Sequence, residues 1–187
     1  MSDTGAKPDN AEGKKTPAAK KKNNGPKYSG YDLDCFLSPQ DVLRAVRELD
    51  QSGFFLEDIS CLDIQEGLFL VYHFDRYEQP GRVGLRVLLD RNNPEIPSIF
   101  DIYPGAAWHE RECFDFFGVR FTDHPNLIPL LLDPDYKGLP PLLKDEGDRQ
   151  GLEQILPERD VSPVSVQSQE LIQKIHDCSK THDRTQS

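Results

Sequence analysis

Residues 101–125 read DIYPGAAWHERECFDFFGVRFTDHP and place the chain's only tryptophan, Trp108, in a dense cluster of charges. Between Pro104 and Gly118, small and aromatic residues recur at helical spacing, which predicts a helix over residues 106–117. Glu110 would lie in the middle of its apolar face. A carboxylate there is costly unless it is paired, so we expect Glu110 to meet backbone donors, a basic residue of a partner, or an arginine of the chain. The candidate arginines are Arg82, Arg86 and Arg120.

The opposite face of the predicted helix carries Trp108, Arg111, Glu112 and Asp115. An ordinary surface helix exposes solvated charge, whereas a large indole beside charges is typical of a protein interface. Arg111 and Asp115 stand four residues apart, so we expect them to form an ion pair on this outward face. The pattern predicts a helix that contacts its own sheet on one side and a neighbour on the other.

The sequence around this helix predicts an α+β fold, a two-layer domain with a mixed or antiparallel sheet packed by helices. Ser38 and Pro39 are typical of a helix start, and an apolar stripe follows until Gly53. Apolar runs predict strands at 54–64, 68–74 and 83–89, a turn at Glu66-Gly67 and a short strand at 119–121. The prolines in residues 91–97 predict irregular structure there.

Composition divides the chain into three parts. Residues 1–30 contain seven lysines and three acids and have no apolar periodicity, which predicts a disordered basic tail. Residues 31–123 form the predicted α+β core domain. Residues 124–187 are expected to be an extended, proline-rich, partner-binding tail, with a short helix at 167–178.

The charge balance and the cysteines narrow the range of partners. The net charge is −10, and the basic tail leaves the rest of the chain still more acidic, which argues against nucleic acid or anionic lipid as the main partner. No apolar run reaches the roughly 20 residues of a membrane helix, so we expect membrane contact only through partners. The cysteines are far apart and lack CxxC spacing, which predicts reduced thiols and no zinc or iron–sulfur site: Cys35, Cys61, Cys113 and Cys178.

The charged helix does not match a catalytic motif. Residues 108–112 read WHERE, but the residue four after His109 is Cys113, so the HExxH spacing of zinc hydrolases is absent. Paired carboxylates can perform acid–base chemistry, yet no evident nucleophile is nearby, and ion pairing is the preferred interpretation. His124 precedes a proline and is interpreted as part of a structural turn. We therefore predict no catalytic, cofactor-binding or metal-binding residue in this chain.

Together these residues resemble a known family. The chain contains a run of charged and aromatic residues at fixed spacing: Glu110-Arg111-Glu112, Asp115, FFG at 116–118, and His124 before a proline. This run is similar to the motif of the 30 kDa subunit of respiratory complex I. In bacteria this family is the C subunit of NADH-quinone oxidoreductase. Residues 98–108, SIFDIYPGAAW, also resemble that family. The resemblance extends over residues 38–145. The chain departs from the family pattern at residues 128–129 and 138–145, where basic residues are usual. The chain could therefore instead be the equivalent subunit of a related membrane-bound energy-converting hydrogenase or deazaflavin-dependent dehydrogenase.

The resemblance implies a structural subunit of the peripheral arm, at the cytoplasmic face of the inner membrane. Such a subunit scaffolds the large hydrogenase-like (49 kDa-type) quinone-site subunit while a proton-translocating complex passes electrons from NADH to quinone. It binds no cofactor itself, and the assembly uses FMN, iron–sulfur clusters, NADH and quinone. We expect interface or structural roles for Trp108, Glu110, Arg111, Glu112, Asp115 and His124. Two other interpretations remain, an independent enzyme that uses the helix carboxylates and an interaction module unrelated to respiration.

Overall fold

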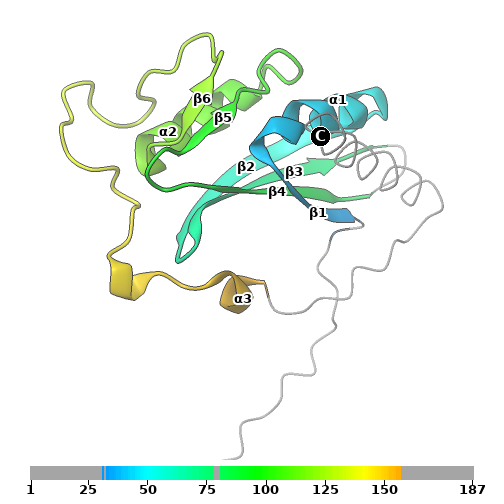
Figure 1. The fold of residues 1–187 in the computed structure, drawn as a ribbon. Coiled ribbons are helices and arrows are strands. Elements are labelled where there is room, and N and C mark those ends of the chain that lie inside the picture. Colours follow the sequence, from blue (N-terminus) through cyan, green and yellow to red (C-terminus); the bar gives the residue numbers. More distant parts are fainter. Residues whose placement is uncertain (1–30, 32, 78–80, 157–187) are drawn as a thin grey trace, which may run out of the picture.

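A four-stranded sheet with the order β1-β4-β3-β2 forms the centre of the molecule (Figure 1). The computed structural model describes residues 31, 33–77 and 81–156. The strands are β1 (Leu33–Leu37), β2 (Phe55–Ile64), β3 (Gly67–Asp75) and β4 (Val83–Leu89). β2, β3 and β4 pair antiparallel, whereas β1 lies parallel to β4. The predicted α+β class is confirmed, and the sheet is mixed.

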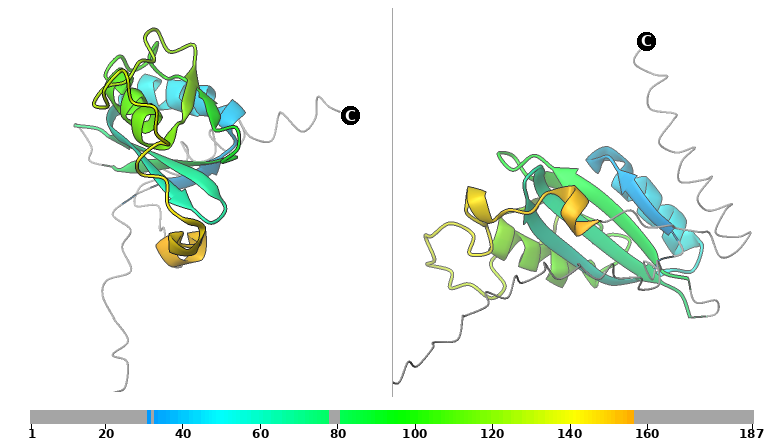
Figure 2. Two further views of the ribbon diagram at one scale, coloured as in Figure 1. Left: turned by 90° about the vertical axis from the view of Figure 1, so that its left-hand side faces the viewer. Right: turned by 90° about the horizontal axis from the view of Figure 1, so that it is seen from below.

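Two helices cover one face of this sheet, α1 (Val42–Gln51) and α2 (Ala106–Phe117) (Figure 2). The buried side chains of α1 recur at helical spacing and belong to the main core with alternate residues of β3 and β4. A 3-10 turn (Pro39–Asp41) precedes α1, so the helix begins three residues later than the Ser-Pro pair suggested. Ser38 donates to the Asp41 carboxylate at 2.7 Å instead of capping the backbone.

The opposite face of the sheet carries a smaller apolar cluster. Ile64, Phe69 and Val71 are buried there against the short helix α3 (Leu152–Ile155) and Leu156. This face is only partly covered, because Phe36, Leu62 and Leu88 remain between 38% and 56% exposed. The two faces therefore differ, with a thick core under α1 and α2 and a thin one under α3.

Two strands were not predicted from sequence. β1 was missed, and residues 91–97 were expected to be irregular, whereas β5 (Glu95–Pro97) pairs in parallel with β6 (Arg120–Thr122). That expectation is wrong because prolines are tolerated in a short edge strand whose partner lies on one side only. The predicted basic tail at 1–30 and the predicted helix at 167–178 lie outside the described residues.

The segment after residue 123 follows β6 and crosses to the far side of the sheet (Figure 1). The buried carboxylate of Asp63 holds it there. Asp63 accepts the Lys144 backbone N–H at 2.9 Å and forms ion pairs with Arg91 at 2.7 Å and Arg149 at 3.2 Å. The short turn η2 (Glu146–Asp148) lies between these contacts, and the Gln65 N–H donates to the Gln150 carbonyl at 3.1 Å. One carboxylate thus joins β2, the β4–β5 connection and the C-terminal segment.

Replacing Asp63 with alanine is expected to lower the free energy of unfolding by about 1.5–3 kcal/mol at pH 7, because the Lys144 N–H and two guanidinium groups lose a charged acceptor. Denaturant titration measures this loss, and Glu153→Ala, at an exposed position, should change stability by less than about 0.5 kcal/mol. A loss for Asp63→Ala no larger than that of the control would contradict the role of Asp63.

The same substitution has a defined pH dependence. Burial alone would raise the pKa of Asp63, but the Lys144 N–H and the Arg91 and Arg149 guanidiniums outweigh it and hold that pKa below its usual value. In the unfolded chain the pKa of an aspartate is about 3.9, and in the folded protein the pKa of Asp63 is lower. The ionised carboxylate therefore stabilises the fold at pH values above about 3.9. This stabilisation is lost as the pH falls through the folded-state pKa. The stability difference between the wild type and Asp63→Ala should therefore narrow below about pH 4.

Candidate functional site

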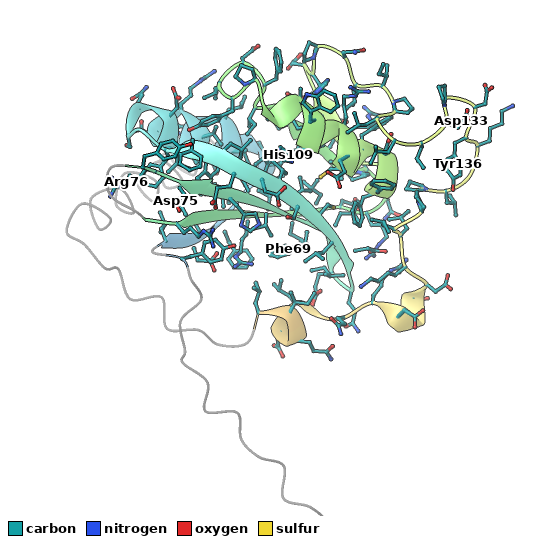
Figure 3. The ribbon with its side chains drawn as sticks, turned by 180° about the vertical axis from the view of Figure 1, so that it is seen from behind. Phe69, Asp75, Arg76, His109, Asp133 and Tyr136 are labelled. Atoms are coloured by element: carbon teal, nitrogen blue, oxygen red, sulfur yellow. The ribbon has the colours of Figure 1, made fainter. Side chains whose placement is uncertain are left out.

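Helix α2 sits on β2 (Figure 3). It ends at Gly118, which has a φ of 76° in the left-handed region that glycine tolerates best. The residues of the charged motif differ in their exposure. Glu110, Cys113 and Asp115 are buried, whereas Trp108 is 65% exposed and Glu112 is also exposed. The helix therefore presents an indole and a carboxylate to solvent while it buries two other carboxylates.

Glu110 points into the protein, as its spacing predicted. Its side chain is fully buried, and it accepts the Ser98 hydroxyl at 2.5 Å and the Ile99 backbone N–H at 2.8 Å. These bonds join α2 to the segment that follows β5. The expected backbone donor is present, but the expected arginine is not. The three candidates contact other carboxylates: Arg82 with Glu57, Arg86 with Asp34, and Arg120 with Glu95.

The environment of Glu110 favours its protonated form. Burial raises its pKa to about 7, although the bonds from Ser98 and Ile99 oppose the rise. His124 Nε2 lies 3.8 Å from Glu110 Oε2, and burial lowers the pKa of His124. Both shifts oppose an ion pair between Glu110 and His124, because each disfavours the charged form of its group. His124 Nδ1 accepts the Asn126 N–H at 3.0 Å, which closes the turn after β6.

Asp115 does not face outward and does not pair with Arg111, so both expectations are wrong. It is 5% exposed, and its Oδ2 accepts the backbone N–H groups of Leu130 at 2.8 Å, Leu131 at 2.7 Å and Leu132 at 3.1 Å. The segment after His124 crosses this face of α2 and turns three consecutive donors toward the helix. Backbone donors that lose water need acceptors, and Asp115 supplies one for all three.

Arg111 binds the same segment through its carbonyl groups. Its Nε donates to the Ile128 carbonyl at 2.9 Å and its Nη2 donates to the Pro129 carbonyl at 2.7 Å. The guanidinium also lies 5.8 Å from the centre of the Trp108 ring, within the range of a cation–π contact. One turn of α2 thus offers donors to the carbonyls and an acceptor to the N–H groups of a single loop.

We give the name α2 surface to four exposed residues of α2 and of the segment that it holds: Trp108, Glu112, Ile128 and Leu131. Trp108 is 65% exposed, Ile128 50% and Leu131 67%. The loop residues were not singled out from sequence, because residues 124–145 lack periodicity and their placement depends on Arg111 and Asp115. Large apolar groups held in place beside charges are suited to contact another protein.

The carboxylates of α2 do not converge on one point. Glu110 faces the core, Asp115 binds the loop backbone and Glu112 faces solvent. Within the described ranges, no group of three or more His, Cys, Asp or Glu residues could hold a metal ion. None of the helices in that same part of the chain is long and apolar enough to cross a membrane.

Comparison with known proteins identifies the motif. Residues 37–150 match the family described as "Respiratory-chain NADH dehydrogenase, 30 Kd subunit". This range contains α2 and the segment 124–145 that crosses it. The chain belongs to this family. The resemblance found in the sequence is therefore confirmed. Members of this family are subunits of respiratory NADH-quinone oxidoreductase complexes.

Relatives in this 30 kDa subunit family are similar over most of the described region. The C subunit of the NADH-quinone oxidoreductase of Roseiflexus sp. (strain RS-1) is 40% identical over 121 residues, covering 61% of this chain and 69% of the relative. The C subunit from Moorella thermoacetica is 38% identical over 121 residues, covering 62% of this chain and 81% of the relative. A chain of the membrane-bound sulfane sulfur reductase, an archaeal respiratory membrane complex, superposes with a TM-score of 0.55 at 27% identity, covering 65% of this chain and 74% of that one.

Replacing Asp115 with alanine is expected to release the loop. Hydrogen bonds to a charged group contribute about 1.5–3 kcal/mol, so amide hydrogen exchange at residues 130–132 should accelerate roughly tenfold or more. The matched control is Glu112→Ala on the same helix, where exchange in the loop should not change. Equal exchange rates in Asp115→Ala and the wild type would show that Asp115 does not hold the loop.

Proposed function

We propose that this chain is a structural subunit of the peripheral arm of a proton-translocating NADH-quinone oxidoreductase, and that the α2 surface docks onto the large hydrogenase-like (49 kDa-type) quinone-site subunit. In this role the chain scaffolds its partner while electrons pass from NADH to quinone in other subunits. Membership of the 30 kDa subunit family supports the kind of complex. The docking role rests on the geometry of α2 and its loop.

The observation that carries the docking role is the exposure of Trp108, Ile128 and Leu131 on α2 and on the segment that α2 holds. Tryptophan is among the residues that contribute most to protein–protein binding. Arg111 and Asp115 hold the backbone at Ile128 and Leu131, so these side chains are already placed before a partner binds. Preorganisation lowers the entropy cost of association. Residues 124–187 would accordingly act as the partner-binding tail that their composition predicts.

Several features support a subunit without chemistry of its own. The carboxylates of α2 face different directions, so no pair of them shares a pocket. The thiols of Cys35, Cys61 and Cys113 are buried, and burial raises the pKa of Cys35 to about 11. A protonated, buried thiol is a poor metal ligand and a poor nucleophile. We infer that FMN, the iron–sulfur clusters and the NADH and quinone sites belong to other subunits of the assembly.

The location that follows from this role is the cytoplasmic face of the membrane, reached through partner subunits. The acidic balance of the chain opposes direct binding to an anionic lipid surface. It favours instead a partner that presents basic residues. A native complex that keeps this chain after high-salt washing of membranes, and loses it only when the peripheral arm dissociates, would agree with this location.

A second candidate is the equivalent subunit of a related membrane-bound complex with another electron donor or acceptor. The likeness to a chain of the membrane-bound sulfane sulfur reductase favours it. A subunit inventory of the native membrane complex separates the two. An NADH-binding flavoprotein in the inventory supports the first candidate, and its absence from an intact complex supports the second.

Replacing Trp108 with alanine is expected to weaken association with the large subunit about 30-fold, which corresponds to roughly 2 kcal/mol for a central aromatic contact. The measurement is a binding titration between the purified chain and the large subunit produced from the same genome. Arg111→Ala should also weaken binding, because it frees the carbonyls of Ile128 and Pro129.

The matched control for Trp108→Ala is Phe36→Ala, which removes a 56% exposed aromatic side chain from the opposite face of the sheet. The affinity of the Phe36→Ala variant for the large subunit should stay within about twofold of the wild-type affinity. Docking through the α2 surface would be refuted by equal affinities of Trp108→Ala and the wild type, provided that both proteins unfold at the same temperature.

A further inference from the structure

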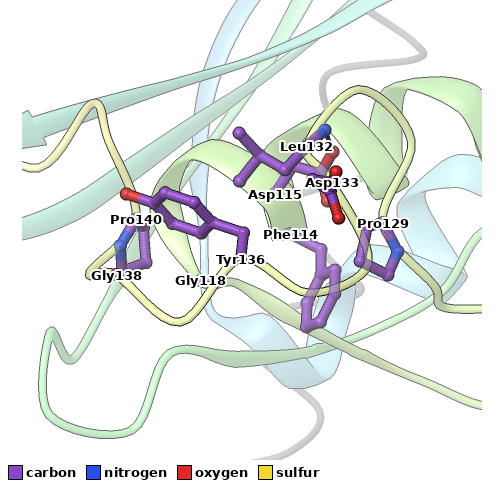
Figure 4. Close-up of a pocket in the computed structure, with 9 residues that line it drawn as sticks. All are labelled: Phe114, Asp115, Gly118, Pro129, Leu132, Asp133, Tyr136, Gly138 and Pro140. Atoms are coloured by element: carbon purple, nitrogen blue, oxygen red, sulfur yellow. Dashed lines mark hydrogen bonds between the residues drawn. The ribbon is translucent and has the colours of Figure 1, made fainter.

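A pocket of about 200 Å³ lies between the C-terminal end of α2 and the loop that follows residue 128 (Figure 4). Its walls are mainly apolar and include Phe114, Pro129, Leu132 and Tyr136. Asp115 and Asp133 add two carboxyl groups to the same lining, and Figure 4 shows them on one side of the pocket. The pocket therefore combines aromatic and aliphatic walls with two acidic groups at one end.

The wall formed by Tyr136 is held in place by its own loop. The Tyr136 hydroxyl donates to the Leu139 carbonyl at 2.8 Å. Gly138 makes this possible, because a Cβ at that position would collide with the same hydroxyl oxygen. The ring is thus fixed by a close backbone approach, and the pocket does not depend on a freely moving side chain.

Asp115 lines this pocket and has an unused acceptor. Its Oδ2 takes three backbone N–H groups, whereas its buried Oδ1 has no hydrogen-bond partner in the described part of the chain. Asp133 accepts the Asp135 N–H through Oδ1 alone. Among residues 31, 33–77 and 81–156, no basic side chain forms an ion pair with either carboxylate. A buried carboxylate with a free oxygen is costly, and a cationic donor would reduce that cost.

We propose that this pocket receives an arginine side chain of the partner subunit, with its guanidinium group against Asp115 and Asp133 and its stem along the apolar walls. The inference rests on the proposed docking function and names the chemistry of the contact. Arginine fits better than lysine because its planar group donates in two directions at once and stacks on aromatic rings such as those of Phe114 and Tyr136. The acidic balance of this chain favours a basic partner.

The first test uses the full-length chain and a small probe. N-acetyl-arginine amide should bind with a dissociation constant on the order of 1 mM and shift the backbone amide signals of Leu132, Asp133 and Gly138 in a 1H–15N titration. N-acetyl-citrulline amide has the same shape without the charge and should shift them at least fivefold less at equal concentration. Equal shifts with the two probes, or shifts only elsewhere in the chain, would overturn the proposal.

Variants locate the binding within the loop. Asp133→Asn should weaken binding of the arginine probe at least fivefold, whereas Asp135→Asn, at an exposed position two residues away, should leave it unchanged. The lysine-rich residues 1–30 are the competing source of a cation. If their deletion alone shifts the same amide signals, the pocket serves the chain's own tail and the proposal fails.

The second test uses the complex with the large subunit and separates this inference from the docking role. Asp133→Asn should weaken association at least tenfold relative to Asp135→Asn. If Trp108→Ala weakens association and Asp133→Asn does not, docking through α2 stands and the arginine pocket is refuted. If the chain does not associate with the large subunit at all, the proposed function fails, while the probe titration still decides whether the pocket selects a guanidinium group.

Discussion

The shape of the α2 surface depends on one carboxylate oxygen, Asp115 Oδ2, which accepts three consecutive backbone N–H groups from residues 130–132. A segment without regular structure normally loses much conformational entropy when it is fixed. Hydrogen bonds to α2 offset this loss of entropy, because Asp115 binds three N–H groups of the segment and Arg111 binds two of its carbonyls. A loop that lacks secondary structure thereby becomes part of a fixed surface, and Trp108, Ile128 and Leu131 lie exposed on it.

Glu110 provides the matching contact on the inner side of α2. Its bonds to Ser98 and Ile99 tie the helix to the segment after β5, next to the main core. Burial raises the pKa of Glu110 to about 7, so this carboxyl group is about half protonated near pH 7. The charged motif of α2 is thus mostly architectural in the described structure. Glu110 fixes the helix, Arg111 and Asp115 fix the loop, and Glu112 is exposed to solvent.

Sequence patterns predicted the parts of this structure that depend on near neighbours. Helical spacing placed Glu110 inward, and apolar runs located β2, β3 and β4. β1 was missed because its partner β4 lies some 50 residues away, and Asp115 was misplaced because its partners begin 15 residues later without any periodic signal. The rule for residues four apart on a helix predicted an ion pair of Arg111 with Asp115. That pair does not form, since an exposed ion pair contributes little while unpaired backbone groups under a loop cost more.

In the proposed complex the α2 surface contacts the partner, and the partly covered face of the sheet that carries Phe36 and Leu88 does not. Amide hydrogen exchange in the isolated chain and in the purified native complex distinguishes the two faces. We expect slower exchange in the complex across residues 106–117 and 126–133, with β1 and β4 little changed. Slower exchange in β1 and β4, with unchanged exchange in α2 and its loop, would contradict it.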